Sequence, residues 1–151
     1  MGFDIHRLVT DRPMILGGVK IPGAKGLLGH SDADVLLHSL CDALLGAVGA
    51  GDMGTYFPDT DPQWKDTPSR QFVAKALELV SARKWKVANA DLVVLAEAPK
   101  LAPHRLAIQN SVADILKVDR AQVNLKAKTM EGLGPIGAGE AIAAYAVVLL
   151  E

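Results

Sequence analysis

The chain has 151 residues, of which 50% are hydrophobic and 22% charged, and its formal net charge is −1. This length is enough for one domain with a sizeable hydrophobic core, so we expect a single domain over residues 1–151. The balanced charge, without a cluster of Lys and Arg, argues against nucleic acid or an anionic membrane as a partner, but a small anionic molecule could still bind through a local metal ion.

Two short strands are expected first, over residues 2–8 and 14–21, on either side of a turn at residues 10–13. Gly17 and Gly18 interrupt the second strand, which indicates a bulge or the close approach of another segment. Residues 21–30 then form a loop that leads to the first helix.

The apolar run VLLHSLCDALLGAV has the length and spacing of a helix. Ser31, followed three residues later by Asp34, has the outline of a capping box, so we expect the helix to begin there and to end near Gly46 to Gly51. Cys41 is the single cysteine, which excludes an internal disulfide, and its apolar neighbours favour a core position over a nucleophilic role.

The rest of the chain mixes helices and strands. Residues 51–67 form a long irregular stretch, and loops of this length are usually functional or mobile. After it we expect a helix from Thr67-Pro68, with Phe72, Val73, Ala76, Leu77 and Val80 on its apolar side, a strand at 88–99, a helix at 103–116, and strands at 123–129 and 140–151 joined by a Gly-rich turn. This order predicts an α+β fold with helices packed on one face of a small mixed sheet, and a partner subunit is the expected cover for the other face.

Asp4 and His6 are candidate metal ligands. Residues two apart in a strand point to the same face, so both side chains can contact one ion. With His38 from the helix they form a plausible three-ligand set for a zinc-type ion, with a fourth position left for substrate. The alternative is an ordinary histidine buried in a core or an interface.

Acidic and histidine residues also recur every four positions in the helical region. His30, Asp34, His38 and Asp42 could lie along one slowly drifting stripe of a helix. A carboxylate one turn before and one turn after His38 would be well placed to fix the tautomer of its ring.

A Gly-rich segment at residues 132–137 matches the pattern G-x-G-x-x-G. Pro135 lies inside the motif and a strand is expected after it, so we exclude a dinucleotide-binding unit. The preceding residues, Lys128 to Glu131, could hold a phosphate through backbone N–H groups and the Thr129 hydroxyl, with Glu131 able to bind Mg²⁺. On these residues alone, an ordinary loop between strands is the simpler interpretation.

Five stretches of the chain together indicate a known family. They are GFDIHRL, GLLGHSDADVLLHSLCDALLGA, GDMGTYFPDTDP, AEAPKLAPH and KTMEGLG. In order and spacing they resemble the 2-C-methyl-D-erythritol 2,4-cyclodiphosphate synthase family over nearly the whole chain. The resemblance implies a homotrimer with active sites between subunits. It also implies conversion of 4-diphosphocytidyl-2-C-methyl-D-erythritol 2-phosphate to the cyclic diphosphate and CMP, in the non-mevalonate isoprenoid pathway.

The resemblance also implies roles for individual residues. Asp4, His6 and His38 would bind zinc, Glu131 would bind Mg²⁺ or Mn²⁺, and His30 and Thr129 would act in catalysis. Substrate contacts are implied at Asp4, His6, His30, Ser31, Asp52, Met53, Gly54, Phe57, Pro58, Asp59, Thr60, Asp61, Ala96, Pro99, Lys100, Leu101, Ala102, Lys128, Thr129, Met130 and Glu131. Residues 57–61 would form a mobile lid, and residues 96–102 would form a cytidine pocket for the neighbouring subunit.

Two other functions stay open at this point. The candidate metal site could serve a zinc-dependent phosphohydrolase of a small phosphorylated metabolite. Alternatively, the protein could be a non-catalytic trimer that a metal ion stabilises. No targeting segment or long apolar span is visible in the sequence, so we expect a cytoplasmic protein.

Overall fold

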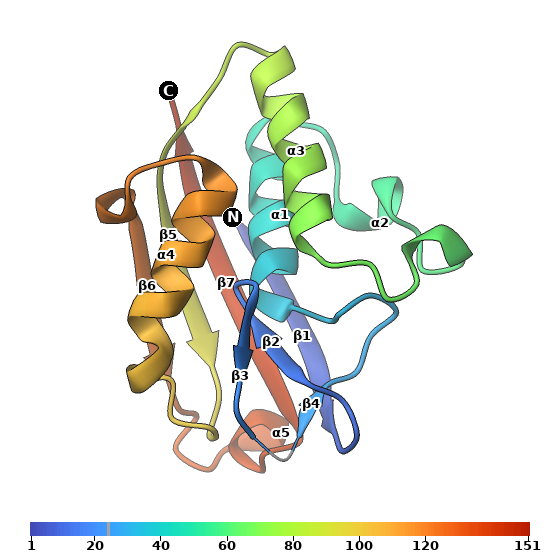
Figure 1. Cartoon of the computed structure of the whole chain (residues 1–151), viewed down its shortest axis with the longest axis vertical. Helices are drawn as coiled ribbons and strands as arrows, with labels where there is room; N and C mark the ends of the chain where they lie inside the picture. Colours follow the sequence, from blue (N-terminus) through green and yellow to red (C-terminus); the bar gives the residue numbers. More distant parts are fainter. Residues whose placement is uncertain (24) are drawn as a thin grey trace.

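A five-stranded mixed sheet runs through the protein, shown in Figure 1 as a computed structural model that describes residues 1–23 and 25–151. The strand order is β4-β1-β7-β5-β6, and only β5 and β6 are parallel neighbours. The strands are β1 (Gly2–Val9), β4 (Gly26–Leu27), β5 (Val87–Leu95), β6 (Val123–Lys128) and β7 (Ala141–Leu150). The mixed sheet predicted from the sequence is therefore confirmed.

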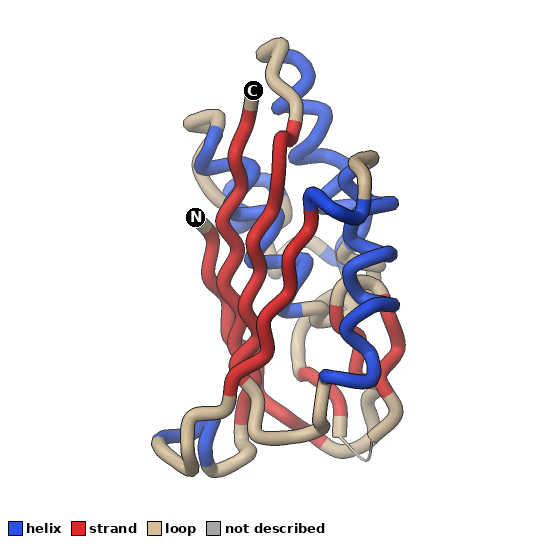
Figure 2. The backbone as a smooth tube through the Cα atoms, turned by 90° about the vertical axis from the view of Figure 1, so that its left-hand side faces the viewer, coloured by secondary structure: helices blue, strands red, loops and turns tan. Residues whose placement is uncertain are grey.

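The three longer helices, α1 (Val35–Ala47), α3 (Arg70–Ala82) and α4 (Arg105–Leu116), lie on one side of this sheet, as predicted (Figure 2). α1 packs against β1 and β7, α4 packs against β6, and α3 lies against both helices. Leu side chains of α1 and the inner face of β5 and β7 form the core between the layers. In the described parts of the chain, no helix is both long and apolar enough to cross a bilayer.

β1 comes very close to α1, and a glycine makes this possible. A β-carbon on Gly2 would lie 1.9 Å from the Ser39 carbonyl oxygen and 2.6 Å from the Ala43 amide nitrogen. Only a residue without a side chain fits between the strand and the helix backbone. The close packing places the side chains of β1 that face inward directly beneath α1.

The segment at 14–21 is a hairpin and not the single interrupted strand that the sequence predicts. β2 (Met14–Leu16) and β3 (Val19–Ile21) pair with each other across Gly17 and Gly18, whose φ angles are 60° and 77°. Two consecutive residues with positive φ reverse the chain in a tight turn, which is why the strand divides here. The predicted close approach is confirmed, because a β-carbon on Gly17 would lie 2.7 Å from the Ile108 side chain.

The start of α1 differs from the expected capping box at Ser31. Asp34 is the N-cap, and its carboxylate accepts hydrogen bonds from the amides of Leu36 and Leu37. Ala33 has a φ of 57°, in the left-handed region, so the helix cannot extend back through it. Within the predicted loop at 21–30, β4 pairs with the end of β1, and Ala24 lies outside the described residues.

The predicted irregular stretch at 51–67 contains two short helices, α2 (Met53–Tyr56) and η1 (Pro62–Trp64). α3 begins at Arg70, later than the predicted Thr67-Pro68, and most of its predicted apolar side is buried. The helix predicted at 103–116 is α4, preceded by η2 (Ala102–His104), and η3 (Arg120–Gln122) follows it. A short α5 (Gly134–Gly137) occupies the Gly-rich turn, and the strand predicted after it is β7.

Candidate metal centre and active-site cleft

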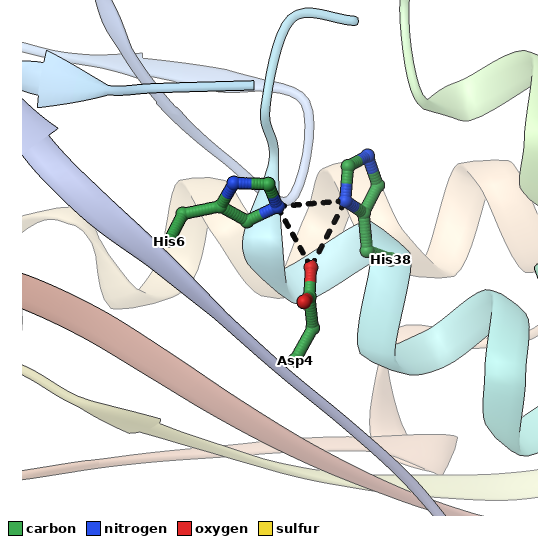
Figure 3. A group of neighbouring side chains, drawn as sticks. All are labelled: Asp4, His6 and His38. Carbon is green, nitrogen blue, oxygen red and sulfur yellow. Dashed lines mark hydrogen bonds and ion pairs between the residues drawn. The ribbon is translucent and has the colours of Figure 1, made fainter. Parts of the chain in front are cut away.

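Three potential ligand atoms converge where α1 crosses β1. The Nε2 atom of His6 and the Nδ1 atom of His38 lie 2.8 Å and 3.0 Å from Oδ2 of Asp4, and the two nitrogens lie 3.1 Å apart. Figure 3 shows the carboxylate and both rings pointing to one place. Asp4 and His6 come from alternate positions of β1 and share its inner face, while His38 comes from the first turns of α1.

The ring of His6 is oriented for metal binding by its other nitrogen. Nδ1 lies 2.6 Å from the backbone carbonyl oxygen of Leu28. A carbonyl can only accept a hydrogen bond, so Nδ1 carries a proton, and in the neutral ring Nε2 keeps its lone pair. The lone pair of His6 therefore points at Asp4 and His38, as a metal ligand requires.

The spacing and chemistry of the three groups fit a zinc-type ion. With bonds of about 2.0–2.1 Å, a tetrahedral zinc ion holds its ligand atoms about 3.4 Å apart. The observed separations of 2.8–3.1 Å are only slightly shorter, so a small outward movement of the side chains would admit an ion. Asp4, His6 and His38 form a group that could hold a metal ion.

The electrostatics of the cluster also favour a cation. Burial raises the pKa of Asp4, but hydrogen bonds from His38 and His6 outweigh it and hold the pKa well below its usual range. Burial lowers the pKa of His6, but the hydrogen bond and charge of Asp4 outweigh burial, so this pKa is raised. The ionised carboxylate thus stabilises positive charge at this point, whether a proton or a metal ion supplies it.

The cluster lies at the base of a cleft of about 310 Å³. Eight of the residues proposed from the sequence line it, namely Asp4, His6, His30, Ser31, His38, Met53, Phe57 and Asp59, together with Asp42, Trp64 and Phe72. The other proposed residues of this region, Asp52, Gly54, Pro58, Thr60 and Asp61, belong to the same segment around α2. The structure therefore brings the first group of proposed residues together around the candidate metal ligands.

The predicted stripe of alternating His and Asp on one helix is wrong. His30 precedes α1, and its Nε2 atom lies 3.2 Å from the Asp61 carbonyl oxygen, to which it donates. Asp34 is fully buried and binds the backbone amides of Gly17 and Gly18 instead of supporting His38. Asp42 does line the cleft, accepts a hydrogen bond from the Met53 amide, and has a pKa raised by burial. The ring of His38 is supported by serine hydroxyls, which the stripe does not contain.

Aromatic rings form part of the lining of the cleft. The rings of Phe57 and Phe72 have centroids 4.5 Å apart, and Trp64 meets Phe57 edge-on at 5.1 Å. These contacts hold the segment after α2 against α3. The indole N–H of Trp64 is buried and has no hydrogen-bond partner within residues 1–23 and 25–151.

The remaining proposed residues lie elsewhere on the same chain. Leu101, Ala102 and Lys128 line a separate cleft of about 320 Å³, together with Arg105, Leu125, Lys126 and Ala127. Ala96, Pro99 and Lys100 lie in the connection from β5 to η2. Lys128, Thr129, Met130 and Glu131 follow one another at the end of β6, and none of them lines the first cleft. A single chain therefore does not bring the two groups of proposed residues together.

Glu97, which the sequence does not single out, anchors the loop that carries Thr129 and Glu131. Its carboxylate accepts hydrogen bonds from the Met130 amide (2.7 Å) and the Gly132 amide (3.3 Å). The Thr129 hydroxyl donates to Glu131 over 3.1 Å. The Thr129 and Glu131 side chains thus lie side by side, as phosphate binding next to a second cation would need.

Fold and site together define a class of protein: a small α+β domain with a candidate divalent-metal centre between a strand and a helix. The sequence matches the YgbB family over residues 1–151, and the chain belongs to this family. A relative from Thermosynechococcus vestitus, named 2-C-methyl-D-erythritol 2,4-cyclodiphosphate synthase, is 54% identical over 99% of this chain and 93% of its own length. The family indicated by the sequence motifs is confirmed.

Solved structures agree in fold. A 2C-methyl-D-erythritol-2,4-cyclodiphosphate synthase in a form bound to CDP is 45% identical, with a TM-score of 0.92, over 99% of this chain and 97% of that one. The bifunctional IspDF of Campylobacter jejuni is 42% identical with a TM-score of 0.95, and this chain spans 40% of that longer protein. Both likenesses cover the whole sheet and its helices.

Proposed function

We propose that the protein converts 4-diphosphocytidyl-2-C-methyl-D-erythritol 2-phosphate to 2-C-methyl-D-erythritol 2,4-cyclodiphosphate and CMP, as a step of the non-mevalonate isoprenoid pathway. The observation that carries the proposal is the convergence of Asp4, His6 and His38 in a lined cleft. This convergence occurs in a chain that is 54% identical to a relative named 2-C-methyl-D-erythritol 2,4-cyclodiphosphate synthase.

The reaction depends more on how the enzyme positions the two ends of the substrate than on a strong base. The substrate's own 2-phosphate oxygen attacks the β-phosphorus, and this oxygen is already ionised near neutral pH. The new bond joins it to the β-phosphorus, while the bond to the bridging oxygen breaks and CMP leaves with the electron pair. Holding the two ends in attack geometry can supply roughly 7–11 kcal/mol of the barrier. A cleft rich in fixed polar groups suits this chemistry.

We propose zinc at Asp4, His6 and His38, and Mg²⁺ or Mn²⁺ at Glu131. A divalent cation in either place would neutralise the charge of the bound diphosphate. Imidazole and carboxylate ligands suit zinc, whereas an isolated carboxylate beside phosphates suits Mg²⁺. Support comes from the lone pair of His6, which points into the cluster, and from Glu131, whose carboxylate lies beside the Thr129 hydroxyl.

The two catalytic roles proposed are those of His30 and Thr129, as hydrogen-bond donors to the phosphates. His30 reaches the first cleft, where Ser31 and residues 52–61 would contact the methylerythritol end. Leu101, Ala102 and Lys128 line the second cleft, and with their sequence neighbours at 96–100 and 129–131 they would bind the cytidine diphosphate end. Because one chain keeps these clefts apart, we propose that each active site combines the first cleft of one subunit with the second cleft of its neighbour.

A homotrimer would supply this arrangement, and the open face of the sheet supports it. Phe3 and Ile5 on β1, and Tyr145, Val147 and Leu149 on β7, all expose large apolar side chains on the face away from the helices. The rings of Phe3 and Tyr145 lie side by side with centroids 4.7 Å apart. A continuous apolar patch of this kind marks a surface that another protein surface covers.

Val147→Lys is expected to dissociate the assembly. Val147 is exposed in the single chain, so the substitution costs little in folding but places a charge in the buried centre of the proposed interface. Light scattering after size exclusion would show a trimer for the parent and a smaller species for the variant. Ala82→Lys, which adds the same charge at the exposed end of α3, is the control and should stay trimeric. A trimeric Val147→Lys protein would place the interface elsewhere.

The proposed activity is tested by phosphorus NMR. Incubation of the protein with the substrate and Mg²⁺ is expected to give equimolar CMP and cyclic diphosphate, and a chelator is expected to stop the reaction. Free methylerythritol phosphates instead of the cyclic product would favour the phosphohydrolase. A folded, metal-loaded protein that gives no product would favour a non-catalytic trimer. The cytoplasmic location stays a prediction.

A further inference from the structure

Ser69 is the N-cap residue of α3, but its hydroxyl does not cap the helix. The side chain is fully buried and turns toward the candidate metal ligand His38. Its Oγ atom lies 2.8 Å from Nε2 of His38, the ring nitrogen that faces away from Asp4 and His6. The same hydroxyl hydrogen bonds to the carboxylate of Asp32.

For a neutral His38 ring, which is the form that binds a metal ion, the proton count of this chain of contacts has one solution. An ionised carboxylate only accepts, so the single hydroxyl proton of Ser69 goes to Asp32. The Ser69 oxygen must then accept from His38, and Nε2 of His38 carries the ring proton. The lone pair of His38 is left on Nδ1, which lies 3.0 Å from Asp4. A carboxylate that acts through a hydroxyl thus selects the tautomer that can bind a metal ion.

Asp32 is itself held in place, which keeps Ser69 in one orientation. Its carboxylate also accepts from the Ser69 amide over 3.1 Å and from the Asp34 amide over 3.2 Å. The Asp32 amide donates to the Thr67 carbonyl over 3.2 Å. These bonds join the segment before α1 to the segment before α3, so the hydroxyl proton of Ser69 has a fixed acceptor.

Ser31 contributes less to this arrangement. Its hydroxyl lies 3.1 Å from the same nitrogen of His38 and also accepts from the Ala33 amide at 3.2 Å. It has no carboxylate partner in the described part of the chain that would fix its proton. The Ser31 hydroxyl proton is free to turn toward the Ser69 hydroxyl, 3.4 Å away, whereas the Ser69 proton is held by Asp32.

We infer that Ser69, oriented by Asp32, is a positioning residue that holds His38 in the tautomer and rotation that bind the metal ion. The inference rests on the proposed function, because it needs Asp4, His6 and His38 to be ligands. Loss of such an outer contact typically costs 10- to 100-fold in metal affinity. Ser69 would thereby couple the start of α3 to the metal centre.

The test is the zinc affinity of the full-length protein, measured by competition with a chromophoric chelator. Ser69→Ala is expected to bind zinc about 10- to 100-fold more weakly than the parent. Ser69→Thr keeps the hydroxyl and should recover most of the affinity. Ser39→Ala is the matched control, since Ser39 is equally buried and only one residue from His38, but its hydroxyl donates to the Leu36 carbonyl. This control should bind zinc like the parent.

Spectroscopy separates positioning from a general loss of structure. With Co²⁺ in place of zinc, the visible absorption of Ser69→Ala should change in intensity and position, while Ser39→Ala should match the parent. If Ser69→Ala does not fold, Asp32→Asn leaves Ser69 in place but weakens its acceptor, and a lower zinc affinity is expected there as well.

The outcomes distinguish the inference from the proposed function. Parent-like zinc affinity in Ser69→Ala, or in a folded Asp32→Asn protein if Ser69→Ala does not fold, would overturn the role of Ser69. A parent protein that binds no zinc would instead overturn the proposed metal centre itself. Equal losses in Ser69→Ala and Ser69→Thr would also count against the inference, because the hydroxyl would then not be the group that matters.

Discussion

His38→Ala is expected to remove zinc from the protein and to lower turnover at least about 1000-fold. The substitution leaves only Asp4 and His6, and two protein ligands on one strand cannot fix a tetrahedral site that needs three. Without the ion, the proposed reaction loses the charge that would neutralise the diphosphate, an effect of several kcal/mol. Zinc per chain, measured by atomic absorption, and the rate of CMP release check the two parts separately.

The control for this substitution is His104→Ala. His104 ends η2, outside the first cleft, so this variant should keep its zinc. A similar loss of zinc in both variants would point to a general effect of removing histidine. Full zinc content in the His38→Ala protein would remove His38 from the ligand set and would leave its contact with Asp4 as an ordinary hydrogen bond.

Asp34→Ala is expected to lower the free energy of unfolding by about 3 kcal/mol at neutral pH. The fully buried carboxylate accepts four backbone hydrogen bonds: the amides of Gly17, Gly18, Leu36 and Leu37. It thus caps α1 and ties the β2–β3 turn to the helix. Alanine leaves these buried amides without partners. Urea unfolding measures the change, and Asp119→Ala, which removes an exposed cap of η3, should cost only about 1 kcal/mol.

Asp34 should also change how the free energy of unfolding depends on pH. Burial raises its pKa from 3.8 to about 6 in the folded protein, although the amides of Gly18, Leu37 and Gly17 oppose the change. Between these values the folded state binds more protons than the unfolded state. Relative to Asp34→Ala, the parent should therefore lose up to about 3 kcal/mol of stability as the pH rises from about 4 to about 6. A constant difference between the two proteins across this range would contradict the raised pKa.

The sequence predicts the parts of the site that depend on short spacing. Asp4 and His6 are two residues apart in a strand, so their common face follows from the geometry of any strand. The place of His38 in a helix follows from its apolar neighbours. The mixed sheet with helices on one face follows from the order of strands and helices.

Contacts between distant segments could not be predicted in this way. Nothing near Ser69 in the sequence shows that its hydroxyl turns toward His38, because the approach depends on how α3 packs against α1. The same is true of Asp34, whose partners Gly17 and Gly18 belong to a hairpin turn packed against the start of α1. Ala33 also has a left-handed backbone conformation that no local sequence pattern indicates. Because α1 cannot extend back through Ala33, its N-cap is Asp34 and not the predicted Ser31.

The alternation along β1 restricts how this strand can vary. Asp4 and His6 face the helices, while Phe3 and Ile5 face the open side of the sheet. Inserting or deleting one residue within β1 would exchange the two faces beyond that point, exposing the candidate ligands and turning aromatic and aliphatic side chains into the cleft. Both the proposed metal centre and the apolar surface would be lost through one such change. Insertions and deletions in β1 should therefore be tolerated only at the ends of the strand. An engineered extension of the protein should leave residues 3–6 unchanged in length.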